Sequence, residues 1–201
     1  MNTDGRRARA DERIAQTRDQ ILASFASLLE DDPNDEITMG RIAERAGVTA
    51  RTVHRHFPSR SDLIAAFGDW CRENLLPVIP LNDLSDLPQV IAQAGRYLDR
   101  NPNLSRALAQ SSVGQEVMKG YTEAFLAQLM QRLDEANPDL DPLSRRRVLA
   151  SLHYLNSVLP WVVLKDAFDM SGDEVSDVIG WAMELIIATV RPPASSGQKA
   201  D

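Results

Sequence analysis

Five arginines between Thr38 and Arg60 are the side chains best suited to bind another molecule. The whole chain carries a formal net charge of −7, whereas this stretch holds five arginines against one acid, Glu44. Guanidinium groups form forked hydrogen bonds with phosphate oxygens and with base edges. We therefore expect a cationic patch whose natural partner is phosphate. A two-helix corner with a solvated arginine face is the alternative that charge alone leaves open. The five arginines are Arg41, Arg45, Arg51, Arg55 and Arg60.

The residues around this patch predict two short helices joined by a tight turn. Thr38 can cap a first helix over residues 39–46, and Thr49 can cap a second helix. Gly47 can adopt the left-handed conformation that a turn between them requires. This pattern predicts a helix-turn-helix.

The second of these helices has one apolar face and one cationic face. Val53 and Phe57 lie four residues apart and are expected to be buried, while Arg51 and Arg55 form another i, i+4 pair. Pro58 ends the helix because it cannot continue the hydrogen-bond ladder. In a helix-turn-helix, the second helix lies in the major groove of DNA with its N-terminal residues near base edges. We therefore expect the cationic face to contact DNA.

Two segments of this region resemble the N-terminal signature of the TetR family of bacterial transcriptional regulators. They read IAERAGVT over residues 42–49 and TVHRHFPSRSDL over residues 52–63. The resemblance covers roughly residues 11–74. The sequence departs from the family pattern at His54, where tyrosine is usual, and at Arg60, where lysine is usual. Arg60 keeps the positive charge, whereas His54 lacks the phenol hydroxyl.

Nine residues of this region are predicted to bind DNA. We expect Arg51, Thr52 and Arg55 to contact base edges, because arginine can form a bidentate pair of hydrogen bonds with guanine. The other predicted residues are Thr49 and the backbone of Ala50 at a phosphate near the helix N-terminus, Thr38 and Arg60 on the flanking DNA backbone, and His54 and His56 at phosphate or bases.

Charge and helix-breaking residues divide the chain into four regions. Residues 1–10 are expected to form a flexible basic arm, whose arginines Arg6, Arg7 and Arg9 either add phosphate or minor-groove contacts or are simply solvated. Residues 11–74 are expected to form the helix-turn-helix domain, including the first part of the helix that links it to the rest. Residues 75–192 are expected to form a larger helical domain, which the family resemblance implies to be the site of effector binding and dimerisation. Residues 193–201 are expected to form a disordered tail.

Apolar residues recur at helical spacing along the chain, and no segment alternates as a strand would. Pro160 lies inside the helix expected over residues 143–168, and a proline in that position should kink or break the helix. The predicted fold class is therefore all-α: an N-terminal three-helix helix-turn-helix domain followed by a larger helical domain. The expected helices span residues 11–30, 87–98, 104–109, 116–136, 143–168 and 174–191.

The last predicted helix, residues 174–191, has apolar side chains on more than one face. Such a helix needs two neighbours, which one chain or a second copy can supply. The family resemblance implies a homodimer through the last two helices. A two-fold dimer also suits a palindromic operator on double-stranded DNA.

The family resemblance implies that the larger domain binds an unidentified small-molecule effector that releases the protein from DNA. A ligand shifts the protein between two shapes only if it binds them with different affinities. Eight side chains combine apolar bulk with polar groups as ligand pockets do, although each also suits ordinary core packing. They are Tyr97, Met118, Tyr121, Phe125, Met130, His153, Asn156 and Trp161.

Catalytic and metal-binding patterns are absent from the sequence. With one cysteine, Cys71, and three histidines, the chain has neither a disulfide framework nor a Cys/His zinc cluster, and no motif supplies an activated nucleophile. We expect no enzyme activity, no cofactor and no bound metal. The absence of a signal or membrane-spanning pattern indicates a cytoplasmic protein that does not enter a membrane.

The sequence therefore predicts a sequence-specific DNA-binding transcriptional regulator, most simply a repressor that a small molecule releases from its operator. A helical dimeric adaptor without DNA binding is one alternative, but it leaves the arginines of the second helix unexplained. A small-molecule-modifying enzyme is the other.

Overall fold

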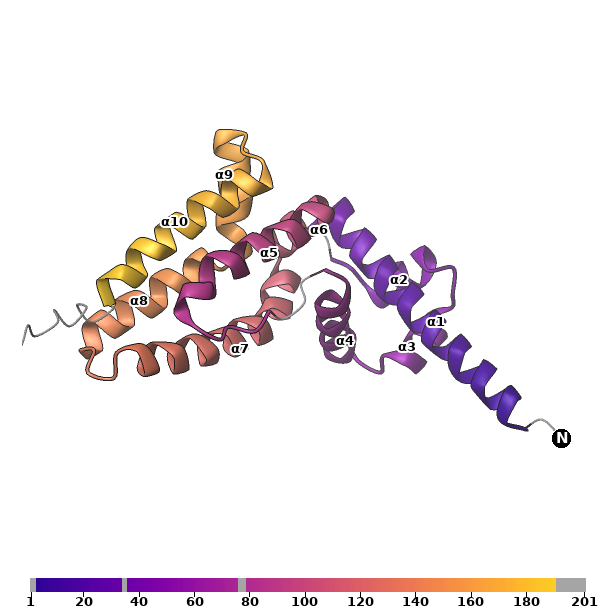
Figure 1. Ribbon diagram of the computed structural model, residues 1–201. Helices are drawn as coiled ribbons and strands as arrows, with labels where there is room; N and C mark the ends of the chain where they lie inside the picture. Colours follow the sequence, from indigo (N-terminus) through magenta and orange to yellow (C-terminus); the bar gives the residue numbers. More distant parts are fainter. Residues whose placement is uncertain (1–2, 34–35, 76–78, 191–201) are drawn as a thin grey trace, which may run out of the picture. The chain divides into compact units, whose positions relative to one another are not determined.

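The computed structural model describes residues 3–33, 36–75 and 79–190 of the chain. This part contains ten α-helices and one 3-10 turn, and it contains no strand (Figure 1). The predicted all-α fold class is confirmed. Contacts divide the chain into two compact units, residues 1–75 with 102–118 and residues 76–101 with 119–201.

Three helices form the small core of the first unit. They are α1 (Thr3–Asp31), α2 (Met39–Arg45) and α3 (Ala50–His56). Their apolar faces converge as the spacing predicts, because the side chains expected in this core are all at most 4% exposed. These side chains are Ile21, Phe25, Ile42, Ala43, Val53 and Phe57.

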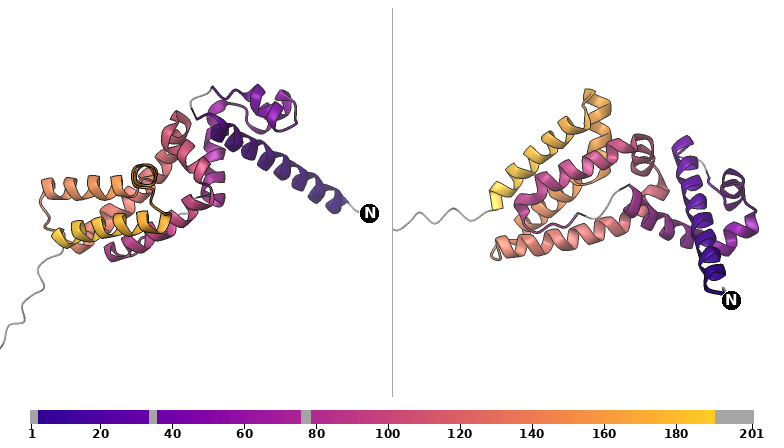
Figure 2. Two further views of the ribbon diagram at one scale, coloured as in Figure 1. Left: turned by 90° about the horizontal axis from the view of Figure 1, so that it is seen from above. Right: turned by 45° about the vertical axis from the view of Figure 1, so that its right-hand side comes forward.

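Helix α1 is longer than its apolar stripe. It begins at Thr3, so residues 3–10 continue the helix and differ from the flexible arm expected there. Alanine, arginine and glutamate are strong helix formers, and residues 6–13 consist largely of them. Side chains 6–16 are nevertheless exposed, and this part of α1 projects from the rest of the first unit (Figures 1 and 2).

Helix α4 (Arg60–Asn74) covers the other side of α1. Ser59 and Asp62 form a reciprocal capping box at its start, as the sequence pattern indicates. The Phe25 and Phe67 rings pack with their centroids 4.8 Å apart. The first unit also includes α6 (Pro102–Gln110) and the start of α7 (Ser112–Ala136), where Leu104 and Leu108 are buried. These residues had been expected in the larger domain.

The second unit consists of the 3-10 turn η1 (Leu84–Asp86), α5 (Leu87–Arg100), the remainder of α7, α8 (Pro142–Leu155), α9 (Val158–Phe168) and α10 (Gly172–Val190). The break expected in the helix over residues 143–168 is present, and α8 and α9 are bent by 60° from each other. The break lies at Asn156 and Ser157. Pro160 is therefore in the first turn of α9, where backbone N–H groups have no intrahelical acceptor. The missing N–H of proline costs no helical hydrogen bond at this position.

Helix α10 packs most extensively on α5. Small residues allow the close approach: a Cβ atom on Gly95 would overlap the Ser176 hydroxyl, and one on Gly172 would overlap the Asp99 carboxylate. Nearby, Asp99 accepts a hydrogen bond of 2.7 Å from Lys165 of α9. The buried side of α10 includes Val175, Ile179, Met183 and Ile187.

Within residues 3–33, 36–75 and 79–190, no single helix is both long and apolar enough to cross a membrane. The bent pair α8 and α9 passes that test only when taken together. The tail expected to be disordered, residues 193–201, lies outside the described residues.

Candidate nucleic-acid interface

Helices α2 and α3 form a helix-turn-helix with the predicted caps. The Thr38 hydroxyl accepts a hydrogen bond from the Arg41 amide at 3.3 Å, and the Thr49 hydroxyl accepts one from the Thr52 amide at 3.2 Å. Gly47 has a φ of 63° in the turn, a left-handed conformation that glycine adopts without a steric penalty. Local sequence therefore determines where both helices begin.

Helix α3 is buried on one face and open on the other. Val53 and Phe57 are 0% and 1% exposed. Arg51, His54 and Arg55 are exposed, and neither arginine has an ion pair or side-chain hydrogen bond to another described residue. The two guanidinium groups of α3 are thus available to a partner.

The other three arginines of the patch hold the first unit together. Arg45 forms an ion pair of 2.5 Å with Asp31 and donates to the Ser27 hydroxyl, which ties α2 to α1. Arg41 donates to the Glu36 carbonyl at 3.4 Å. Arg60 donates to the Ile37 carbonyl at 2.6 Å, so the start of α4 lies beside the start of α2. The structure thereby brings Arg60 and Thr38 close together.

The remaining predicted DNA-binding residues differ in exposure. Thr38, Thr49 and Ala50 are exposed, while Thr52 is half-buried and its hydroxyl lies 2.9 Å from that of Thr49. All of the residues predicted on α3 and its cap therefore lie on one short element, with Thr38 and Arg60 together at the starts of α2 and α4.

His56 is the most enclosed of these residues. It is half-buried, and its Nε2 atom is shielded from solvent without a hydrogen-bond partner among the described residues. Burial lowers the pKa of His56, and the positive charges of Arg55 and Arg18 lower it further. The ring therefore favours its neutral form, which is a weaker phosphate ligand than an imidazolium.

Two polar residues of α1 hold α3 in place, although the sequence pattern did not predict a role for either of them. Gln20 donates to the carbonyl of Ala46 in the turn at 2.7 Å. Arg18 donates to the His56 carbonyl at 3.4 Å, and its guanidinium lies 4.5 Å from the centre of the Phe57 ring. Their signal in the sequence is weak: polar side chains beside an apolar stripe, whose partners lie 26 and 38 residues away.

The eight predicted ligand-pocket residues occupy different environments. Trp161 is 2% exposed, and its Nε1 atom has no hydrogen-bond partner in the described part of the chain. Met130 is 46% exposed, and Met118 belongs to the first unit. The other five, which are Tyr97, Tyr121, Phe125, His153 and Asn156, are half-buried.

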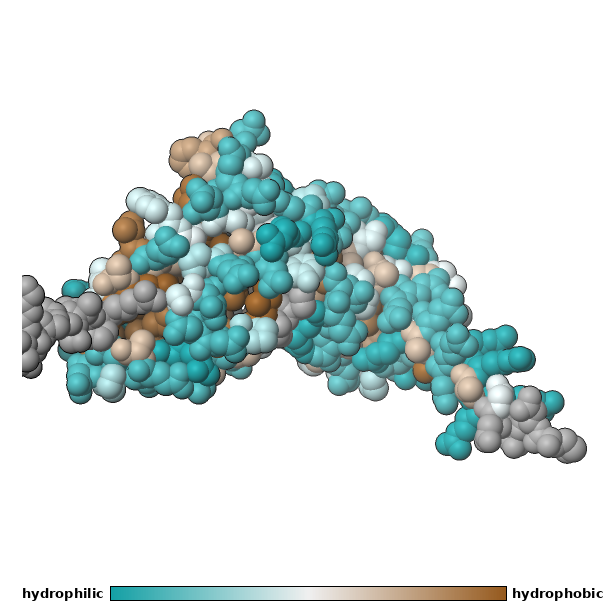
Figure 3. All heavy atoms as spheres, in the orientation of Figure 1, coloured by the Kyte–Doolittle hydropathy of each residue, from teal (hydrophilic) through white to brown (hydrophobic). Residues whose placement is uncertain are grey.

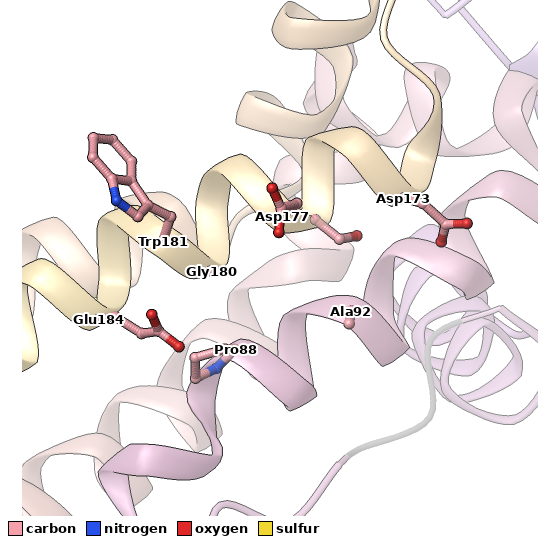
Figure 4. Close-up of a pocket in the computed structure, with 8 residues that line it drawn as sticks. Pro88, Ala92, Asp173, Asp177, Gly180, Trp181 and Glu184 are labelled. Carbon is pink, nitrogen blue, oxygen red and sulfur yellow. The ribbon is translucent and has the colours of Figure 1, made fainter.

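A pocket of about 390 Å³ lies between α5 and α10 of the second unit (Figure 4). It is open and acidic, and it contains none of the eight predicted ligand residues. Among the described residues, no group of three or more histidine, cysteine, aspartate or glutamate side chains is placed to hold a metal ion. The residues lining the pocket are Pro88, Ala92, Asp173, Ser176, Asp177, Gly180, Trp181 and Glu184.

These features define an all-helical protein with an N-terminal helix-turn-helix whose second helix presents two available arginines. Residues 21–67 match the family described as "Bacterial regulatory proteins, tetR family". Residues 21–67 are therefore similar to the N-terminal domain of that family, and the described part of the chain has a TetR-like fold.

Two solved structures share this fold. NalD of Pseudomonas aeruginosa, described as the secondary repressor of the MexAB-OprM multidrug efflux pump, has a TM-score of 0.60 and 17% identity, with 86% of this chain and 96% of that chain covered. A tetR-family transcriptional regulator from Streptomyces coelicolor has a TM-score of 0.57 and 19% identity, with 88% and 82% covered.

Curated relatives include nucleoid occlusion factors. SlmA of Shewanella pealeana is 25% identical over 138 residues, which is 66% of this chain and 68% of SlmA. SlmA of Shewanella sediminis is 33% identical over 97 residues, which is 45% of this chain and 49% of that relative. The chain thus matches between about half and two thirds of the length of these relatives.

Proposed function

We propose that the protein is a sequence-specific transcriptional regulator that reads its operator with α3. The observation that carries this proposal is the exposure of Arg51 and Arg55 on a capped helix whose opposite face is buried. In an acidic protein, the local positive charge on this helix favours a polyanion that can accept the forked hydrogen bonds of guanidinium.

The contacts expected of each residue follow from its place. Arg51 and Arg55 face outward from α3 and are proposed to pair with guanine in the major groove. Thr49 and the amide of Ala50 stand at the start of α3, where a phosphate is favoured. Thr38 and Arg60 lie together at the starts of two helices and are proposed to contact the DNA backbone.

We propose that the protein acts as a homodimer through α8, α9 and α10. Large apolar side chains on these three helices are 42% to 66% exposed. In Figure 3, brown hydrophobic atoms gather over the second unit, whereas the projecting end of α1 is mostly teal. Two copies that bury this surface against each other also present two α3 helices to a palindromic operator. The exposed side chains are Leu143, Tyr154, Leu159, Val163, Phe168, Trp181 and Leu185.

Repression and its release by a small molecule complete the proposal. Trp161 has a buried Nε1–H without an acceptor among the described residues, and a ligand carbonyl or ether oxygen would supply one. His153 and Asn156 are half-buried on the same two-helix segment and add polar groups. The effector must favour the shape that does not fit DNA, because equal affinity for both shapes leaves repression unchanged. We propose that this regulator is cytoplasmic and has no catalytic role.

A binding experiment tests the function directly. Duplexes selected from a random pool by the wild-type protein are titrated by fluorescence anisotropy at several salt concentrations, beside a scrambled duplex of equal length. We expect tighter binding to the selected duplex and an affinity that falls as salt rises. The double variant Arg51→Ala/Arg55→Ala is expected to bind both duplexes equally. Failure of the wild-type protein to bind any duplex in low salt would overturn the proposal.

A further inference from the structure

The N-terminal turns of α1 carry a charged surface that the helix-turn-helix does not use. Residues 5–18 include five arginines and two acids, Asp11 and Glu12. The side chains of Arg6, Arg9 and Arg13 are exposed and form no ion pair or hydrogen bond with another described residue. Within the described residues of the first unit, no contact accounts for them.

These three arginines form a row. Successive residues of an α-helix are turned by about 100°, so Arg6, Arg9 and Arg13 lie within about 60° of one another. Asp11 and Asp19 lie on the other half of the helix circumference, and Glu12 lies at the border. The projecting part of α1 therefore has a cationic side, whose positive charge is not neutralised by acidic side chains on the same side of the helix.

Contacts of α1 with its neighbours show where this row lies. Along α1 from its C-terminal end, Asp31 and Ser27 meet Arg45 of α2, and Gln20 and Arg18 then meet the turn and the end of α3. Residues 3–16 continue beyond α3, on the side away from α2. The projection is about 20 Å long, which equals roughly six base pairs of duplex DNA.

The hydrogen bond of Gln20 shows which side of α1 carries the arginine row. Arg6, Arg13 and Gln20 are seven residues apart and share one side of the helix. The Gln20 side chain holds the carbonyl of Ala46, in the turn that leads into α3. The arginine row therefore continues, beyond α3, the side of α1 that carries this turn.

We propose that the projecting turns of α1 form a second DNA-contacting element, which binds phosphates next to the bases read by α3 through Arg6, Arg9 and Arg13. This inference rests on the proposed function of α3. Duplex DNA is the occupant that the surface favours, because the row is cationic, is as rigid as a helix, and continues the surface of the helix-turn-helix. Phosphate contacts add affinity without sequence preference.

A triple variant separates this element from α3. Arg6→Ala/Arg9→Ala/Arg13→Ala keeps good helix formers in α1 and removes three charges. The matched control, Arg96→Ala/Arg100→Ala/Lys119→Ala, removes three charges from exposed positions on α5 and α7 of the second unit, outside the helices proposed to pair. Thermal unfolding of both variants should match that of the wild-type protein.

The readout is the salt dependence of binding to the selected duplex. Each lost phosphate contact lowers the slope of log affinity against log salt by about 0.9, so the α1 variant should lose about 2–3 units per protomer. Its preference for the selected over the scrambled duplex should stay the same. Hydroxyl-radical footprints should lose protection next to, and not within, the bases protected by α3. The control should retain the wild-type slope and footprint.

Three outcomes would overturn this inference: an unchanged slope in the α1 variant, an equal loss in the control, or a loss of base preference. If the wild-type protein binds DNA and Arg55→Ala weakens it, such an outcome rejects the α1 contact alone. If the wild-type protein binds no duplex at all, both the α1 contact and the proposed function are rejected.

Discussion

The guanidinium of Arg18 lies 4.5 Å from the centre of the Phe57 ring, and it also donates to the neighbouring His56 carbonyl. Arg18 therefore joins α1 to the last residues of α3 through a cation–π contact and a hydrogen bond. Gln20 joins α1 to the turn before α3. The orientation of α3 thus depends on two polar side chains of the first helix as well as on the apolar core.

Replacing Arg18 tests this dependence. We expect Arg18→Ala to lower the free energy of unfolding by about 1–2 kcal/mol, because both contacts with the end of α3 are lost. Urea denaturation followed by circular dichroism measures the change. Arg7→Ala is the matched control, since Arg7 is exposed on the same helix. Equal stability of the two variants would show that Arg18 does not hold α3.

Arg55 and Arg60 are expected to affect DNA binding in different ways. Arg55→Ala should weaken binding to the selected duplex by about 1–3 kcal/mol and relax base preference locally, because a base contact is lost. Arg60→Ala should weaken all duplexes alike and reduce the salt slope by about one unit, because a phosphate contact is lost.

Anisotropy titrations at several salt concentrations distinguish these two effects. Arg60→Lys serves as a control because it keeps the charge and a donor for the Ile37 carbonyl, and it should restore the wild-type slope. Equal losses on selected and scrambled DNA for Arg55→Ala would contradict its role in reading bases.

Local signals in the sequence predicted the helix-turn-helix well. The caps Thr38, Thr49 and Ser59 act on amides three residues away, so their partners can be read along the chain. The left-handed Gly47 is equally local. The buried pair Val53 and Phe57 follows from helical spacing alone.

Features that depend on distant partners were beyond the sequence. The partners of Arg18, Gln20 and Arg45 come from other helices, and no spacing rule gives them. The helical start of α1 was missed because polar, arginine-rich composition suits both a solvated helix and a coil. Likewise, only the fold brings Pro88 of α5 beside Gly180 and Trp181 of α10, where the pocket lies.

His56 should make stability depend on pH in a defined direction. Burial, with Arg55 and Arg18, lowers its pKa in the folded protein, so the unfolded chain binds the proton more readily. Stability should therefore fall as the pH drops below about 6.5, the ordinary value, and the loss should be complete below the lowered pKa. His56→Gln should flatten this part of the profile.

Melting temperatures between about pH 7 and pH 5 measure the effect. His54→Gln is the control, because His54 is the neighbouring exposed histidine of α3. If His56→Gln and His54→Gln gave the same change in the profile, the burial of His56 would not be its cause.

Cys71 should report the opening of α4. It is 0% exposed, and burial raises the pKa of its thiol to about 12, so little thiolate forms in the folded protein. We expect no reaction with Ellman's reagent at about pH 8 in native buffer and one equivalent of reaction in urea. Ser61→Cys places a thiol at an exposed position of the same helix and should react at once. Rapid reaction of native Cys71 would show that α4 opens readily.

The exposed apolar side chains of α10 provide the test of the dimer. Trp181 and Leu185 are 62% and 51% exposed, although the opposite side of the same helix is buried against α5. Glutamate at either position places a charge where a second copy is proposed to pack, and burying an unpaired charge costs several kcal/mol. Trp181→Glu and Leu185→Glu should therefore be monomeric by analytical ultracentrifugation and should bind a palindromic duplex more weakly than wild type.

Met130→Glu is the matched control for these variants. Met130 is 46% exposed on α7, outside the three helices proposed to pair. The Met130→Glu variant should remain dimeric, and its affinity for DNA should be unchanged. Since α10 keeps its buried residues in all variants, helical content by circular dichroism should also stay the same, and a monomer that is still folded identifies the lost contact as one between subunits. A dimer that survives both α10 substitutions would place the subunit interface elsewhere on the protein.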